Sequence, residues 1–404
     1  MLADSAPWVP ALPPFLLASA VCIAAVPASM WLAERTGAVA EPDEDRHLHP
    51  EPTPRLGGIA MFAGFAVAMA VFGGSVSTRW QVVAVCAAIT VAMCVDDILE
   101  LPWWLKLTVE VGAGVAVAAT GITIGFLALP GAQGVDVVNL GWVAFPITVV
   151  WVTGMQTSIN FLDGSDGVAA GVVAIVAAVC LLAAVNRVEA PNDVQSGVIV
   201  MCGALMGCCT GFLIFNLPPA RVFMGDTGAH FLGVALSVIT IIGVAKVAVA
   251  LSLLVPLIAL GLPISDTAAA IIRRRRAGLS IAQPDAGHIH HRLLARGMSP
   301  METALTFYLA TAILGCIGLA VFGHRRILDV GFALCSVALA GLWYRTHRRG
   351  RPQVDADGFV IVAGRRASLQ RPRDDDDSWP AAQANDSDAD TSGDYDKGSH
   401  RESD

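Results

Sequence analysis

Long apolar runs dominate the pattern of hydrophobic and polar positions along the chain, and short polar or charged segments separate them. A helix that crosses a bilayer needs roughly 20 apolar residues, and most of these runs approach that length. The pattern therefore predicts an all-α, polytopic membrane protein with about eleven transmembrane helices. The predicted spans are residues 9–33, 57–75, 80–96, 104–127, 142–160, 168–185, 195–215, 229–243, 247–270, 301–322 and 327–344.

The distribution of Lys and Arg predicts how these spans are oriented. With the N-terminus outside, the inner segments hold fifteen of the Lys and Arg residues compared and the outer segments hold five. Positively charged loops stay in the cytoplasm, so we expect an outer N-terminus and a cytoplasmic C-terminal tail in a plasma membrane. The segments that then face the cytoplasm are residues 33–55, 96–106, 160–167, 216–228 and 273–299.

Composition and charge narrow the class further. Hydrophobic residues make up 55% of the chain and charged residues 15%, with a mean hydropathy of +0.62, whereas a soluble domain is about 25% charged. The net charge of −8 comes from the end of the chain, so we expect a membrane domain over 1–345 and a disordered acidic tail over 346–404. The absence of a basic, aromatic-rich patch argues against nucleic-acid binding, and the nine cysteines lie in apolar runs without the spacing of a zinc site.

Two carboxylates and an amide interrupt the apolar pattern in the segment Asn-Phe-Leu-Asp-Gly-Ser-Asp-Gly, residues 160–167. An ionised group at the centre of a membrane helix costs about 2.5–3.5 kcal/mol or more. We therefore expect Asn160, Asp163 and Asp166 at a helix end or in a wet cleft. A polar turn between two helices is the alternative, but other segments on the same side also carry Asp or His clusters, which favours a site.

Asp96 and Asp97 end the third predicted span. Neighbouring residues on a helix point about 100° apart, so one carboxylate can face a cation while the other faces a reactant. Paired acids suit Mg²⁺, whose ligands are oxygen atoms, and they also suit removal of a proton from a nucleophile. The alternative is a solvated helix stop. Lys106 is either a lysine at the membrane interface or a phosphate ligand.

The segment from Asn216 to Gly228 contains two prolines and then Gly-Asp-Thr-Gly, which we expect to open the next helix. Asp226 or Thr227 could be a plain N-cap. A helix N-terminus that carries an aspartate is equally a good place for a metal ion and a phosphate group. Both interpretations stay open.

Histidines mark the last and the first of the cytoplasmic segments. The last contains His288, His290, His291 and Arg292, which together suit an anion; zinc is the alternative, but no cysteine is nearby. The first is a proline-rich stretch that holds His49 and Arg55 and ends in Gly57-Gly58. Taken alone, it is a stiff loop. We expect His230, inside the eighth span, to be packed or hydrogen-bonded rather than a ligand.

In this order the segments resemble the polyprenyl-phosphate N-acetylhexosamine-1-phosphate transferases, integral-membrane enzymes that begin lipid-linked glycan assembly. The resemblance covers roughly residues 10–345, and the sequence His-Ile-His-His-Arg is similar to the branch that transfers GlcNAc-1-phosphate, the WecA type. One departure is that Arg46-His47 stands where many members have Arg-Lys. The motifs that carry the resemblance are residues 49–58, Asp96-Asp97 with Lys106, 160–167, 225–228 and 288–292.

The resemblance implies that UDP-GlcNAc and polyprenyl phosphate give polyprenyl-diphosphate-GlcNAc and UMP, with Mg²⁺ or alternatively Mn²⁺. Asp226 would hold the metal, with Asn160 as a second ligand, and Asp96 or Asp97 would deprotonate or orient the lipid phosphate. A homodimer is also compatible with the resemblance. The residues that would bind substrate are Asn160, Asp163, Asp166, His288, His290, His291, Arg292, Lys106, His49 and Arg55.

Three alternatives remain at this stage. The same chemistry could use another UDP-sugar, such as UDP-MurNAc-pentapeptide. A cation-coupled transporter also carries intramembrane carboxylates, but transporters place them near the midplane between repeats, whereas here they fall at span ends on one side. A catalytically silent scaffold with an acidic tail for partners is the third.

Overall fold

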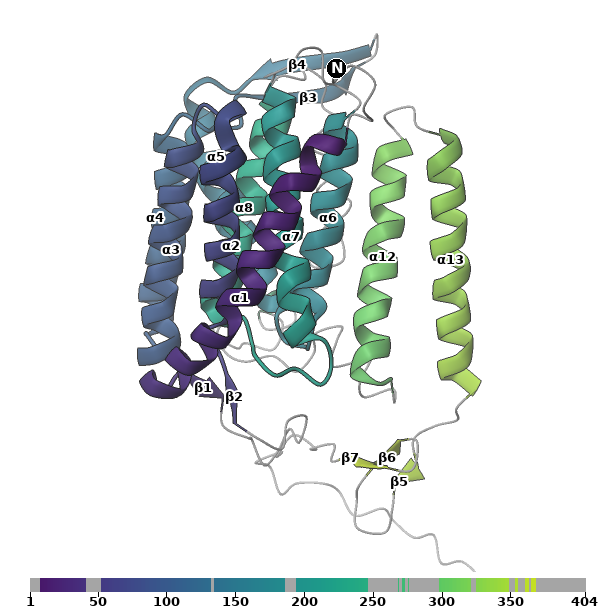
Figure 1. Ribbon diagram of the computed structural model, residues 1–404. Helices are drawn as coiled ribbons and strands as arrows, with labels where there is room; N and C mark the ends of the chain where they lie inside the picture. The colour runs from purple at the N-terminus through teal and green to yellow at the C-terminus, as the bar shows by residue number, and fades with distance from the viewer. Residues whose placement is uncertain are drawn as a thin grey trace, which may run out of the picture. The chain divides into compact units, whose positions relative to one another are not determined.

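The computed structural model describes residues 8–40, 52–131, 134–185, 194–245, 298–320 and 325–348, with single positions between 268 and 275 and short strands between 353 and 367. Helices dominate these residues, as the apolar pattern predicts (Figure 1). The α-helices are α1 (Leu12–Thr36), α2 (Gly57–Phe72), α3 (Arg79–Leu99), α4 (Trp103–Ala119), α5 (Ala144–Leu162), α6 (Val168–Val185), α7 (Val194–Asn216), α8 (Gly225–Ala245), α12 (Pro300–Ala320) and α13 (Arg325–Arg348).

Eight helices in the described part of the chain are long and apolar enough to cross a membrane. They correspond to eight of the eleven predicted spans. Helix α4, with 17 residues, is just too short for such a span, and the part of α13 whose side chains the structure describes, Ala333–Tyr344, is an apolar helix that is shorter still. The predicted span 247–270 lies outside the described residues, so the count of eleven stays a prediction.

Helix α8 is the centre of the bundle. It packs against α3 and α5 most extensively and also touches α2, α4, α6 and α7. It is the most deeply buried of the candidate spans that the structure describes. Because α8 is central, the polar side chains at its start lie among the ends of the neighbouring helices.

Helices α1 and α7 approach each other closely because α7 presents a glycine at every fourth position. A side-chain carbon at Gly203, Gly207 or Gly211 would meet the backbone carbonyl oxygen of a residue in the first turns of α1 or just before it. Small residues at such spacing allow helix backbones to pack in van der Waals contact within a membrane. The close contact anchors α1 along the outside of α7.

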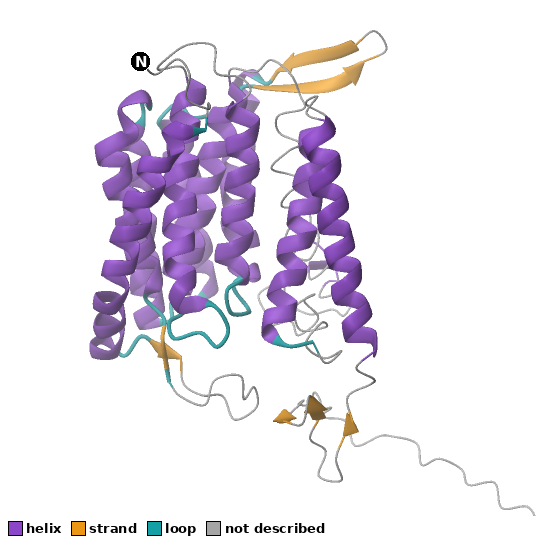
Figure 2. Cartoon of the chain, turned by 45° about the vertical axis from the view of Figure 1, so that its right-hand side comes forward, coloured by secondary structure: helices purple, strands orange, loops and turns teal. Residues whose placement is uncertain are grey.

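A β-hairpin follows α4, formed by β3 (Phe126–Gly131) and β4 (Gly134–Asn139) at the end of the bundle where α1 and α3 begin (Figure 2). This corrects the predicted span 104–127, since α4 ends at Ala119. Gly121 takes a positive φ of 85°, which ends the helical path. The apolar residues that follow fit a strand as well as a helix, so hydrophobicity alone could not separate the two.

Tryptophans mark both ends of the bundle. Trp8, Trp80 and Trp142 lie at the end with the hairpin, and Trp142 is 85% exposed. At the opposite end, four tryptophans lie in the first or the last two turns of their helices. Tryptophan is enriched at both membrane–water interfaces, so these two belts bracket the apolar length of the helices. The tryptophans of the second belt are Trp31, Trp103, Trp104 and Trp343.

Helix α12 packs against α6, and α13 packs against α12. A capping box starts α12: Ser299 N–H donates to Glu302 Oε2 at 2.9 Å, and Glu302 N–H donates to Ser299 Oγ at 3.2 Å. After α13, strands β5 (Gln353–Val354), β6 (Val360–Val362) and β7 (Arg365–Ala367) form an antiparallel sheet. The predicted tail, 346–404, thus contains a small sheet, and most of its remaining residues lie outside those described.

Candidate functional site

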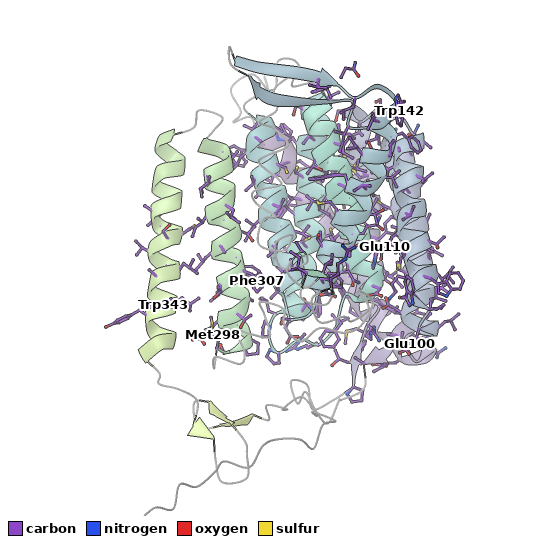
Figure 3. The ribbon with its side chains drawn as sticks, turned by 180° about the vertical axis from the view of Figure 1, so that it is seen from behind. Glu100, Glu110, Trp142, Met298, Phe307 and Trp343 are labelled. Atoms are coloured by element: carbon purple, nitrogen blue, oxygen red, sulfur yellow. The ribbon has the colours of Figure 1, made fainter. Side chains whose placement is uncertain are left out.

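Of the polar segments singled out in the sequence, those that the structure describes meet at one end of the bundle, opposite the hairpin. Helices α3 and α5 end there, and α4 and α8 begin there; Figure 3 shows Glu100 at this end of the bundle and Trp142 at the opposite end. This end also holds a short antiparallel ladder of β1 (Val39–Ala40) and β2 (Thr53–Pro54). The alternating directions of the helices explain why carboxylates far apart in sequence come together.

Asp97 caps the start of α8 from a neighbouring helix. Its Oδ1 accepts the backbone N–H of Asp226 at 3.0 Å, and its Oδ2 accepts the N–H and the hydroxyl of Thr227 at 2.9 and 2.6 Å. Arg55 Nη2 lies 3.8 Å from Oδ1. The first N–H groups of a helix have no partner within the helix, so Asp97 satisfies two of them. The alternative of a plain N-cap at Asp226 or Thr227 is wrong, since both lie inside the helix.

Asp96 turns the other way and joins a charged cluster. Its Oδ1 accepts the N–H of Leu101 at 3.1 Å, and its Oδ2 lies 2.7 Å from Lys106 Nζ. Lys106 Nζ also contacts Asp226 Oδ2, and Asn160 Nδ2 donates to Asp226 Oδ1 at 2.7 Å. The side chains of Lys106 and Asp226 are 30% and 19% exposed, so the cluster is open to a ligand. We call these four residues the charged cluster.

The donor chemistry of the charged cluster fits Mg²⁺. Two carboxylates and an amide oxygen are hard oxygen donors, and the ammonium of Lys106 between the two carboxylates shows that a positive charge is stabilised there. Among the described residues no three His, Cys, Asp or Glu side chains converge as a complete metal site. Mg²⁺ commonly takes only one or two protein carboxylates and completes its shell with water and substrate phosphates, so a partial set is what such an ion needs.

Below the charged cluster, a second polar group lies one helical turn deeper in the bundle. His230 Nε2 lies 2.9 Å from Glu110 Oε1, and Thr157 Oγ1 donates to Glu110 Oε2 at 3.0 Å. His230 Nδ1 lies 2.8 Å from the backbone oxygen of Asp226. The expectation that His230 is a hydrogen-bonded helix residue is confirmed.

The turn between α5 and α6 carries Asp163 and Asp166. Asp166 Oδ2 accepts the N–H of Ala220 at 2.9 Å, which ties this turn to the segment before α8. Tyr308 of α12 donates to the carbonyl of Gly167 at 2.6 Å. Asp163 is half-buried. Burial, together with the negative charges of Asp226, Asp97 and Asp166, holds the pKa of its carboxyl well above the usual range, although Arg55 opposes this shift.

Two glycines let the segment that precedes α2 lie against the start of α8. Gly57 and Gly58 N–H groups donate to the carbonyls of Phe223 and Met224, each at 3.0 Å. A side-chain carbon at Gly58 would overlap the backbone of Gly228, and one at Gly225, whose φ is +67°, would overlap the Arg55 carbonyl. This close approach places Arg55 beside Asp97, next to the charged cluster.

Comparison with known proteins identifies the family. Residues 79–244 match the family model described as glycosyl transferase family 4. The chain is 34% identical over 296 residues to a probable undecaprenyl-phosphate N-acetylglucosaminyl 1-phosphate transferase of Bacillus subtilis, which covers 73% of this chain and 80% of that protein. The chain belongs to the polyprenyl-phosphate N-acetylhexosamine-1-phosphate transferase family.

Other members of the family show similar identity. A decaprenyl-phosphate N-acetylglucosaminephosphotransferase of Mycobacterium tuberculosis is 32% identical over 351 residues, which cover 81% of this chain and 86% of the relative. A phospho-N-acetylmuramoyl-pentapeptide-transferase of Desulforudis audaxviator is 33% identical over 303 residues, 68% of this chain and 86% of the relative. These relatives favour a transferase over the transporter alternative.

The structure brings together most of the site residues that the sequence predicted for this family member. Asp96, Lys106, Asn160 and Asp226 form the charged cluster, and Asp97 and Arg55 lie beside it. Asp163 and Asp166 lie on the adjoining turn. The remaining predicted residues lie outside those that the structure describes: His49, His288, His290, His291 and Arg292.

Sequence reasoning missed Glu110, Thr157 and Tyr308. Glu110 is a charged residue inside an apolar run, which is itself a signal, because such residues face the interior of a bundle and pair there. The roles of Thr157 and Tyr308 depend on contacts between helices, so nothing in their local sequence distinguishes them from other helix residues.

Proposed function

We propose that this chain transfers GlcNAc-1-phosphate from UDP-GlcNAc to polyprenyl phosphate, either undecaprenyl or decaprenyl, and releases UMP. This reaction is a first membrane step of cell-envelope glycan assembly. The observation that carries the proposal is the charged cluster, which opens at one end of a bundle that belongs to this transferase family. The names of the relatives with GlcNAc-1-phosphate activity supply the sugar and the lipid.

The reaction exchanges one phosphorus–oxygen bond for another. An oxygen of the lipid phosphate bonds to the sugar-linked phosphorus of UDP-GlcNAc, and the bond from that phosphorus to the bridging oxygen breaks, so that UMP leaves with the bond's electron pair. Catalysis of phosphoryl transfer consists mainly of positioning and charge neutralisation. The side chains of the charged cluster are suited to both tasks.

Asp226 and Asn160 are the residues we expect to hold Mg²⁺, or Mn²⁺ in its place. A bound ion would neutralise charge on the diphosphate. Lys106 would then leave Asp226 and contact a substrate phosphate, because its side chain is flexible and its ammonium is a point charge that suits phosphate. In the structure, Lys106 lies between the carboxylates of Asp96 and Asp226, so its ammonium is already in the charged cluster, where the substrate phosphate would bind.

Asp96 is the residue we expect to orient or deprotonate the lipid phosphate. Of the two neighbouring aspartates it is the one directed at the charged cluster, whereas Asp97 uses both oxygens to cap α8. The segments with His49 and with His288, His290, His291 and Arg292 would contact the sugar nucleotide, since histidine and arginine suit its phosphates. Arg55, Asp163 and Asp166 would shape the nucleotide pocket between them.

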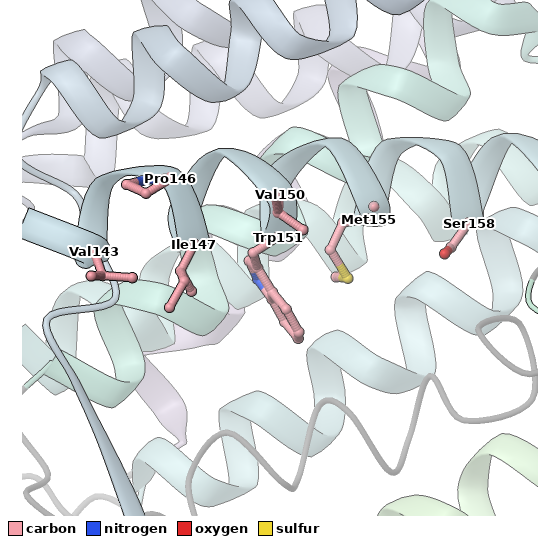
Figure 4. Close-up of a pocket in the computed structure, with 8 residues that line it drawn as sticks. Val143, Pro146, Ile147, Val150, Trp151, Met155 and Ser158 are labelled. Carbon is pink, nitrogen blue, oxygen red and sulfur yellow. The ribbon is translucent and has the colours of Figure 1, made fainter. Parts of the chain in front are cut away.

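An apolar groove along α5 suits the prenyl chain. It has a volume of about 470 Å³ and runs from the η3 turn (Gly141–Val143) toward Ser158, two residues before Asn160 (Figure 4). An isoprenoid needs an apolar surface that leads to the phosphate site, and this groove supplies one. Its lining residues are Val143, Pro146, Ile147, Val150, Trp151, Gly154, Met155 and Ser158.

The site end of the bundle would face the cytoplasm, where UDP-sugars are made, with the N-terminus outside and the tail inside. The Lys and Arg distribution supports this orientation. A homodimer remains part of the proposal on the resemblance alone.

A donor panel tests the proposal. Purified protein in detergent, with Mg²⁺ and polyprenyl phosphate, receives radiolabelled UDP-GlcNAc or UDP-MurNAc-pentapeptide, and UMP release and labelled lipid are measured. We expect product from UDP-GlcNAc and a loss of product in Asp96→Asn. Product only from UDP-MurNAc-pentapeptide would move the proposal to the other branch of the family. No product from any UDP-sugar would contradict it.

A further inference from the structure

The charged cluster and the polar group beneath it form two layers, one helical turn apart, and each of three helices contributes to both. Helix α4 supplies Lys106 and then Glu110, and α8 supplies Asp226 and then His230, four residues later in each case. Residues four apart lie on the same face of a helix. Lys106 pairs with Asp226 in the outer layer, and Glu110 pairs with His230 in the inner layer.

Helix α5 runs in the opposite direction and completes both layers. Asn160 donates to Asp226 at 2.7 Å in the outer layer, and Thr157 donates to Glu110 at 3.0 Å in the inner layer. Gln156 Nε2 also donates to the Glu110 carbonyl at 3.1 Å. The inner layer therefore repeats the helix arrangement of the outer layer, with the acid and the base exchanged between α4 and α8.

The hydrogen bonds of the inner layer show that Nδ1 of His230 carries a hydrogen. A backbone carbonyl can only accept, so Nδ1 donates to the carbonyl of Asp226. Nε2 and Glu110 Oε1, 2.9 Å apart, then share one proton. His230 is fully buried and Glu110 is 7% exposed, so in the folded protein these two groups depend on each other rather than on solvent for hydrogen bonds.

We propose that Glu110 and His230 are positioning residues for Asp226. The inference rests on the proposed function, in which Asp226 exchanges Lys106 for a metal ion. When Lys106 leaves, the outer pair between α4 and α8 is lost, and the inner pair keeps the two helices in register. His230 also holds the carbonyl of Asp226 itself, so the inner pair restrains the residue that must receive the ion. Mutation of a residue that supports a metal ligand in this way typically lowers the affinity for the metal by about 10–100-fold.

Binding of Mn²⁺ in the presence of UDP-GlcNAc, without lipid acceptor, tests this inference without turnover. The affinity is measured by electron paramagnetic resonance on the purified full chain. Glu110→Ala and His230→Ala should each weaken Mn²⁺ binding by about 10–100-fold. Glu110→Gln should bind like the parent protein, because its amide can donate to Nε2 of His230 and preserve the pair. In transfer assays, the alanine variants should lower kcat and leave the KM for polyprenyl phosphate unchanged.

Thr240→Val is the matched control. Thr240 accepts a hydrogen bond from Trp151 at 3.2 Å between α8 and α5, far from Asp226 along α8. Its loss should lower the Tm and leave Mn²⁺ affinity unchanged. An equal loss of affinity in Thr240→Val and Glu110→Ala would overturn the inference, because any weakening of α8 would then have the same effect.

The outcomes separate the inference from the proposed function. If the parent protein binds Mn²⁺ and makes product while both alanine variants bind like the parent, only the inference fails. If the parent neither binds Mn²⁺ nor makes product, the proposed function fails and the inference fails with it. If one alanine variant does not fold, the other decides: Mn²⁺ binding like that of the parent protein in that variant would overturn the inference.

Discussion

Two adjacent aspartates have different tasks at the scale of single residues. Asp97 is buried and uses both oxygens to cap the start of α8, while Asp96 pairs with Lys106 in the charged cluster. From the sequence, Asp96 and Asp97 looked alike, because adjacent acids at a helix end carry no information about which way each points. The contact with α8, about 130 residues away, separates their roles.

We predict that Asp97→Ala destabilises the protein and that Asp96→Asn does not do so to the same extent. The first change leaves two N–H groups and the Thr227 hydroxyl without acceptors, at a cost of about 1–3 kcal/mol for a buried group. Asn at position 96 retains an acceptor for the Leu101 N–H. Thermal unfolding in detergent measures both. Equal losses of Tm would contradict the division of roles.

The raised pKa of Asp163 predicts a pH-dependent stability. The folded protein holds the proton of this carboxyl more tightly than the unfolded chain, so the protonated form favours folding. That contribution is complete below the usual carboxyl pKa of about 4 and is lost as the pH rises through the folded value. Asp163→Asn, which mimics the protonated form, should therefore raise the Tm more at pH 8 than at pH 5 in metal-free buffer. The same Tm difference at both values would contradict this account.

At the scale of elements, the glycine spacing on α7 determines how closely α1 can pack. Gly207 faces the Phe15 carbonyl, and Gly203 and Gly211 face carbonyls about one turn away on either side. The sequence shows this spacing plainly. It does not show which helix lies opposite, because a glycine stripe identifies a contact surface and not its partner.

We predict that Gly207→Ala lowers the Tm, because a methyl group there would overlap the Phe15 carbonyl oxygen. Overpacking of this kind costs about 1–3 kcal/mol. Gly112→Ala on α4 is the control, since a side-chain carbon at Gly112 meets nothing within 4 Å. A Tm for Gly207→Ala equal to that of the control would show that α1 and α7 are less closely packed than described.

The apolar pattern predicted most helices with boundaries close to those observed. It was wrong for the end of the predicted span 104–127, because the apolar residues there fit a strand as well as a helix. The start of α8 illustrates a further limit. The motif Gly-Asp-Thr-Gly was expected to open this helix, and α8 begins at Gly225, but the sequence did not show that Asp97 of α3 caps it. A cap from a distant side chain leaves no signal beside the helix that it starts.

At the scale of the whole molecule, one of the two tryptophan belts lies at the same end of the bundle as the charged cluster. Trp103 and Trp104 are exposed in the first turn of α4, and Lys106 lies two residues after Trp104. The charged cluster therefore lies near the membrane–water interface, where a lipid phosphate and a water-soluble nucleotide can meet. The order of motifs predicted this convergence, because alternating spans bring every second connection to the same side.

The most direct test of the account is Mg²⁺-dependent transfer by the parent protein and by Asp226→Asn. Purified protein, polyprenyl phosphate and radiolabelled UDP-GlcNAc are titrated with Mg²⁺ while labelled lipid is measured. We expect the parent to make product only with Mg²⁺ and the variant to make little even at saturating Mg²⁺, because the carboxylate at the centre of the charged cluster is lost. A folded Asp226→Asn variant with the parental rate at saturating Mg²⁺ would contradict the account.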